Sequence, residues 1–132
     1  MRTLLLASAL VATLGLQAQD AMQRTYAADG SVATEEYMVG ERLRHVTYHA
    51  NGEVKETGWY TESGPEGTWK QYDAAGKLMA KARFSEGKRT GKWVLRDPVS
   101  GNLYKLTYGN GSLKKGEELD GQGTLLAVRE SQ

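Results

Sequence analysis

The stretch that decides the fold is residues 48–93, YHANGEVKETGWYTESGPEGTWKQYDAAGKLMAKARFSEGKRTGKW. Within it, glycine, aromatic and aliphatic positions recur at a constant offset of 24 residues. The matched positions are Tyr48, Gly52, Val54, Tyr60, Gly67 and Trp69, which return as Tyr72, Gly76, Leu78, Phe84, Gly91 and Trp93. A period of this length indicates stacked supersecondary units. Such repeats build extended surfaces more readily than catalytic pockets.

Side chains inside each unit alternate with a period of two. Between residues 77 and 84 apolar and cationic side chains take turns, with Met79 as the exception: Leu78, Ala80, Ala82 and Phe84 against Lys77, Lys81 and Arg83. This alternation is typical of a strand with one packed and one solvated face. No later stretch offers an apolar helical stripe, so the sequence predicts an all-β protein.

Glycines mark the expected turns. Four dipeptides that tolerate positive φ angles predict tight hairpin turns, namely Asp29-Gly30, Asn51-Gly52, Asn110-Gly111 and Asp120-Gly121. The glycine clusters at residues 64–67 and 87–91 predict longer loops. We therefore expect an antiparallel meander of repeated β-hairpins, about 24 residues per unit, in an open and twisted sheet.

The repeat occupies most of the chain and defines one domain over residues 19–132. The clear units are 48–71 and 72–95, and looser matches extend the period to degenerate units at about 26–47 and 96–132. Degenerate terminal units are expected where repeats cap a stack.

The first 18 residues have the composition of a secretory signal peptide. Arg2 supplies a positive start, residues 4–16 are largely apolar, and Ala18 offers a small residue for cleavage. The alternative, a buried N-terminal helix, is the weaker interpretation. We expect a periplasmic or extracellular protein whose mature chain has no transmembrane segment, because no later segment has the roughly 20 apolar residues that a helical span needs.

Composition limits the classes of partner. The 132 residues hold 17 basic and 16 acidic side chains, and removing Arg2 leaves 16 of each. A neutral and evenly mixed surface predicts neither nucleic acid nor an anionic membrane as a partner. Cysteine is absent, so no disulfide can supplement a thin core.

The repeated residues resemble the MORN-repeat variant family. The residues that carry the resemblance are Tyr48, Asn51, Gly52, Val54, Gly58, Tyr60, Gly67, Trp69 and Tyr72, and the pattern recurs over residues 72–93 with Ala82 in place of the glycine at Gly58. The resemblance implies an antiparallel sheet of hairpins, often single-layered, that acts as a protein- or membrane-associated scaffold. Some bacterial members bear an antitoxin-like label. The family pattern specifies structural positions and transfers no active site.

No residue grouping predicts catalysis, a metal or a cofactor. His45 and His49 would lie roughly 13 Å apart along a strand, too far to share one metal. The adjacent carboxylates of Glu35 and Glu36 should point to opposite faces, and no nucleophile elbow is present. A glycosidase-like pair from distant strands stays open. We therefore expect a protein that is not an enzyme.

The repeated aromatic residues are the remaining candidates for a site. Their main interpretation is packing between strands. Trp59, Trp69 and Trp93 are candidate ligand-binding residues if they are solvent-exposed, and Trp59 should point away from Tyr60. The sequence thus predicts an exported, non-enzymatic module that binds another protein or an envelope component, or serves as a structural scaffold. The alternative is glycan or cell-wall binding through exposed aromatic residues. The partner's identity and the oligomeric state are not predicted.

Overall fold

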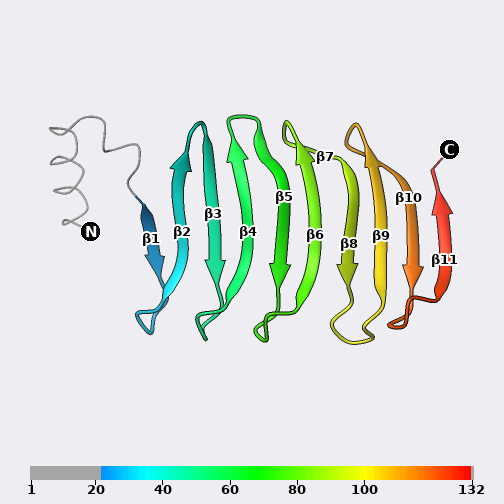
Figure 1. Ribbon diagram of the computed structural model, residues 1–132, viewed down its shortest axis with the longest axis horizontal. Helices are drawn as coiled ribbons and strands as arrows, with labels where there is room; N and C mark the ends of the chain where they lie inside the picture. The colour runs from blue at the N-terminus through cyan, green and yellow to red at the C-terminus, as the bar shows by residue number, and fades with distance from the viewer. Residues whose placement is uncertain (1–21, 132) are drawn as a thin grey trace, which may run out of the picture.

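The computed structural model describes residues 22–131, which form a single sheet of eleven strands (Figure 1). The expected signal peptide at residues 1–18 lies outside the described residues. The strands are β1 (Gln23–Tyr26), β2 (Val32–Val39), β3 (Arg42–Tyr48), β4 (Val54–Thr61), β5 (Gly64–Tyr72), β6 (Leu78–Ser85), β7 (Lys88–Arg89), β8 (Gly91–Arg96), β9 (Leu103–Gly109), β10 (Ser112–Leu119) and β11 (Leu125–Glu130).

The sheet is an antiparallel meander that does not close. Successive strands pair in chain order from β1 to β11, except that the two-residue β7 pairs only with β6 and β8 continues the sheet beside β6. Strands β1 and β11 form the two open edges, at opposite ends of one layer (Figure 1). The structure confirms the predicted all-β class, the antiparallel meander and the open sheet.

One five-residue turn recurs at one end of the hairpins. It spans residues 27–31, 49–53, 73–77 and 120–124, and the amide of its first residue donates to the carbonyl of its fifth, as His49 does to Glu53 at 2.8 Å. The expected two-residue turns are therefore wrong at three of the four dipeptides, although Gly30 and Gly52 do adopt positive φ angles, of 88° and 87°. At Asp120-Gly121 the residue with positive φ is Gly123 (88°), because Asp120 opens the turn and accepts hydrogen bonds from two later amides.

A tight turn forms at the remaining dipeptide, Asn110-Gly111. Asn110 and Gly111 have φ angles of 51° and 81°, the signs that a type I′ turn requires. Glu86 and Gly87 form a second turn of this kind, with φ angles of 51° and 79°. The longer loop expected at residues 87–91 is therefore wrong in part, because it contains β7.

The loop expected at residues 64–67 is wrong too. These residues begin β5, with Pro65 opposite Tyr60 and Gly67 opposite Phe84. Gly67 adopts a positive φ of 71° inside the strand, next to an irregularity in the pairing with β4. A glycine at such a position marks a β-bulge rather than the end of a strand.

Register assigns every side chain to one of two faces, because paired residues in neighbouring strands point to the same side. We call the side with Tyr60, Trp69, Phe84, Trp93 and Tyr108 the ladder face, and the side with Arg44, Trp59, Lys70, Lys81 and Lys105 the basic face. Trp59 pairs with Arg44 whereas Tyr60 pairs with Leu43, which confirms that Trp59 and Tyr60 point in opposite directions.

Burial is sparse because one layer has no opposing sheet. Among residues 22–131, Val46 and Trp69 are the large apolar side chains that are buried, each 9% exposed. The Trp69 ring lies against the backbone of Gly58, where a Cβ atom would stand only 2.0 Å from the ring. Gly58 therefore provides the space in which Trp69 is buried.

Replacing Gly58 with alanine should force the Trp69 ring out of its position. We expect Gly58→Ala to lower the free energy of unfolding by about 1–3 kcal/mol, the usual cost of overpacking a tight site. Urea unfolding of both proteins measures the difference. Gly116→Ala is the matched control, since a Cβ there would lie 3.4 Å from the movable end of Leu106. Equal stability of Gly58→Ala and the wild type would contradict this role.

Candidate binding surfaces

The ladder face holds a continuous row of rings, one from each strand between β3 and β9 except the short β7. In order they are His45, Tyr60, Trp69, Phe84, Trp93 and Tyr108, with neighbouring centroids 5.7, 4.9, 6.4, 5.2 and 4.9 Å apart. Most contacts are edge-to-face, the arrangement that the ring quadrupole favours. The rings of this row therefore pack each strand against the next.

Small residues make room for these rings. Trp69 is paired with Ala82, Phe84 with Gly67, and Tyr108 with Gly91. With no large side chain directly across, each ring can lie over the neighbouring strand and meet the next ring along the sheet. Ala82, which stands 24 residues after Gly58, is small enough to lie directly across from Trp69.

The two tryptophans of the ladder have satisfied indole groups. The Trp69 Nε1–H donates to the Trp59 carbonyl at 3.2 Å, and the Trp93 Nε1–H donates to the Arg83 carbonyl at 3.1 Å. Trp69 is buried, so it does not meet the condition of exposure under which it was a candidate ligand residue. Trp93 is half-buried and keeps part of its surface accessible.

An open hollow of about 350 Å³ lies along the ladder. Its lining includes Trp69, Phe84 and Trp93, together with the small side chain of Ala80. The Gln71 amide also borders it and donates to a Glu56 carboxylate oxygen at 2.8 Å. The hollow is therefore mostly apolar and has one polar side.

Trp59 has two arginines over its ring, whereas Trp93 has one, the Arg89 guanidinium carbon at 5.7 Å from its centroid. The guanidinium carbons of Arg42 and Arg44 lie 4.2 and 4.8 Å from the Trp59 ring centroid. Both distances are within the range of cation–π attraction. Trp59 is half-buried on the basic face, and a ligand ring could stack on it only by competing with the guanidinium groups.

A second open hollow, of about 480 Å³, surrounds this cluster. Its lining contains four cations and no carboxylate: Arg42, Arg44, Thr57, Trp59, Gly67, Thr68, Lys70, Tyr72 and Lys81. The expected even mixing of charge is therefore wrong at this surface, since strand alternation directs these cations to one side. In the sequence, the signal for this surface is a set of cations at alternate positions. Which of these cations come together across strands depends on the register of the strands.

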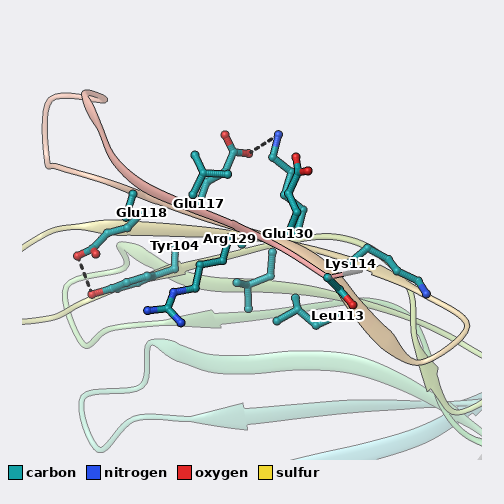
Figure 2. Close-up of a pocket in the computed structure, with 13 residues that line it drawn as sticks. Tyr104, Leu113, Lys114, Glu117, Glu118, Arg129 and Glu130 are labelled. Atoms are coloured by element: carbon teal, nitrogen blue, oxygen red, sulfur yellow. Dashed lines mark hydrogen bonds and ion pairs between the residues drawn. The ribbon is translucent and has the colours of Figure 1, made fainter.

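A third hollow, of about 420 Å³, lies at the C-terminal end of the sheet (Figure 2). Figure 2 shows Tyr104, Leu113 and Arg129 on one side of the strands, whereas Glu117 and Glu130 point to the other. Tyr104 donates to Glu118 at 3.2 Å, and this hydrogen bond raises the pKa of the tyrosine. The aromatic row does not continue here, because the residue paired with Tyr108, the last ring of the row, is Leu113 on β10.

The C-terminal edge also exposes apolar side chains. On β11, Leu125, Leu126 and Val128 are 51, 53 and 44% exposed. An edge strand presents unpaired backbone groups that can accept another strand. This edge is therefore a third candidate surface for contact with protein.

The two histidines have separate surroundings. His45 Nδ1 lies 2.7 Å from a Glu36 oxygen on the ladder face, whereas His49 Nε2 lies 2.7 Å from the Tyr72 carbonyl. Within residues 22–131, no group of three or more histidine, cysteine, aspartate or glutamate side chains is placed to hold a metal ion. Glu35 and Glu36 do point to opposite faces, as their pairing with Val46 and His45 shows.

Glu35 joins three strands at the N-terminal edge. Its carboxylate accepts hydrogen bonds from the Tyr48 hydroxyl and, at 2.7 Å, from the Arg24 guanidinium. These two donors, the hydroxyl first, lower the pKa of Glu35, and the carboxylate in turn raises the pKa of Tyr48. The network links β1 and β3 to β2 on the basic face.

Comparison with known proteins gives no relative: the chain matches no protein-family model, no curated protein and no solved structure. Across the described part of the chain, no helix is long and apolar enough to cross a membrane.

The depressed pKa of Glu35 predicts a pH-dependent contribution to stability. The ionised form is favoured in the folded state, so the contribution is present above the ordinary pKa of glutamate and is lost as pH falls through the lowered folded value. We expect Glu35→Gln to reduce the unfolding free energy at neutral pH by less than about 1 kcal/mol, because the group is near the surface. Unfolding over the acid range should show this difference shrinking as pH falls; a difference that grows would contradict the assignment.

Proposed function

We propose that this chain is an exported, non-enzymatic module that binds another protein through its ladder face or acts as a structural scaffold. The observation that supports the proposal is an apolar row of rings that no second layer covers within residues 22–131. Apolar surfaces of this kind, bordered by polar groups, are typical of protein interaction sites. Aromatic side chains are also enriched at such interfaces.

We propose export because of the N-terminal sequence. We propose a non-enzymatic role because the sequence contains no catalytic grouping. The MORN-like resemblance supports a scaffold role of the same kind. An outward-facing edge at β11 gives a further route to partner binding by strand addition, which uses the exposed backbone groups.

Glycan binding is the second candidate function. The hollow on the ladder face supports it, because half-buried Trp93 lies near the polar Gln71 and Glu56 side chains. Sugar sites combine aromatic surfaces with a few polar groups. The Trp59 ring lies under two guanidinium groups, at 4.2 and 4.8 Å, whereas the Trp93 ring has one, at 5.7 Å, so the ladder face is the better location for an uncharged glycan.

Charge placed on the ladder face should block a protein partner without removing a ring. Ala80 is half-buried in the hollow between Gln71 and Leu95, and a lysine there can extend its amine into solvent. We expect Ala80→Lys to reduce capture of an envelope protein by at least about tenfold, since an unpaired charge opposes an apolar contact. Affinity capture from envelope extract, followed by identification of retained proteins, is the measurement.

Thr107→Lys is the matched control, because it adds the same charge on the opposite face. The proposal expects Thr107→Lys to retain the protein that Ala80→Lys loses. Equal capture by both variants would contradict use of the ladder face, and retention of glycan alone would favour the second function.

The glycan alternative has its own test. Trp93→Ala removes a ring from the hollow, so retention on an insoluble neutral polysaccharide should fall at least about fivefold if rings stack on sugar. The comparison is with Trp59→Ala, whose ring lies on the other face. Equal retention of the wild type and Trp93→Ala would reject neutral-glycan binding at the ladder.

A further inference from the structure

Cations on the basic face extend beyond the hollow as two rows that cross the strands. In the first row, Lys70 is paired with Lys81, Lys81 with Val94, and Val94 with Lys105. The second row contains Arg83 on β6, which is paired with Thr68 on β5, and Lys92 on β8, which is paired with Thr107 on β9. Neighbouring strands are about 4.8 Å apart, so the rows repeat positive charge at that interval or a multiple of it.

The four cations that line the hollow lack anionic partners in the described part of the fold, whereas Lys105, at the end of the first row, is paired with Glu117 on β10. Among the residues that the structure describes, none of Arg42, Arg44, Lys70 and Lys81 lies within ion-pair distance of a carboxylate. Glu66 is paired with Trp59, but its carboxylate accepts a hydrogen bond from the Glu86 amide at 2.9 Å. Lys70 and Lys81 stand directly across from each other, a like-charge pair that destabilises a sheet.

We propose that the basic face binds a linear acidic polysaccharide laid across the strands. A hexose unit is about as long as the separation between strands, so a chain with one carboxylate per unit presents anions at the interval of the cation rows. Arginine and lysine side chains pair with such carboxylates. Hydroxyl groups of Thr57, Thr68 and Tyr72 in the same hollow can hydrogen-bond the sugar.

The surface fits a soluble acidic chain better than it fits a bilayer or a nucleic acid. Binding at a membrane surface combines cations with apolar side chains that enter the lipid, and the hollow and cation rows contain no exposed large apolar side chain. Single-stranded nucleic acids stack their bases on aromatic rings, whereas the Trp59 ring already lies under two guanidinium groups.

The test titrates the full purified chain with polygalacturonate, a linear polymer with one carboxylate per sugar. Dextran is the uncharged comparison, and phosphatidylglycerol vesicles and single-stranded DNA represent the two other classes of polyanion. We expect saturable binding to polygalacturonate at low ionic strength that weakens as salt is added, with no binding to dextran. No binding to polygalacturonate, or tighter binding to vesicles or DNA, would overturn the proposal.

Variants locate the site. Lys81→Glu reverses one charge in the first row and should weaken polygalacturonate binding by about tenfold, since the lost attraction is replaced by repulsion. It should also keep or raise the melting temperature, because a Lys–Lys pair becomes a Lys–Glu pair. Val94→Lys fills the gap between Lys81 and Lys105 and should strengthen binding.

The control is Lys88→Glu, the same charge change on β7 outside the two rows, for which we expect less than about a twofold effect. Unchanged binding by Lys81→Glu, or equal loss in Lys88→Glu, would contradict the assignment. Ala80→Lys on the ladder face should bind polygalacturonate normally, so this proposal and the proposed protein-binding function can fail independently.

Discussion

The structure depends on packing within one face of one sheet. A two-layered protein buries apolar side chains between its layers, but the described residues here form one layer. The ladder supplies the missing contacts by placing a ring from each strand against the ring of the next. Aromatic pairs contribute about 0.5–1.5 kcal/mol each beyond the area that they bury. Trp69, lodged against Gly58, is the most deeply buried ring of this row.

The ladder gives the two faces different tasks. Side chains on the ladder face hold the strands together, so substitutions there affect folding and binding at once. Away from the buried Val46 and the Glu35 network, side chains on the basic face are less constrained by packing. The paired Lys70 and Lys81 destabilise the sheet. This Lys–Lys pair is unfavourable and the fold does not need it. Because functional sites often reduce stability, the pair indicates a ligand-binding role for the basic face.

Much of the sheet could be predicted from the sequence because its signals are local. Alternation over residues 77–84 predicts strand β6 and its two faces, and the repeat predicts the order of the hairpins. The orientation of Trp59 opposite to Tyr60 needed only regular strand geometry. Turn lengths were predicted less well, since a glycine with positive φ can be the fourth residue of a five-residue turn, as Gly52 is, or form a bulge, as Gly67 does.

The candidate sites were less predictable because they depend on contacts between strands. Burial of Trp69 requires Gly58 on the neighbouring strand, and the covering of the Trp59 ring requires two arginines on β3. Composition predicts a protein that is neutral as a whole, but it does not show how the charges are divided between the two faces of the sheet. Register, which one sequence does not specify by itself, brings Lys70 next to Lys81.

The most direct test of the account compares the unfolding free energies of Trp69→Ala and Trp59→Ala. If the ladder holds the sheet together, Trp69→Ala should cost about 3–5 kcal/mol, the range for deleting a buried tryptophan. Trp59→Ala should cost much less, because its ring packs against mobile arginine side chains on the solvated face. Equal losses, or a larger loss for Trp59→Ala, would contradict the central role of the ladder.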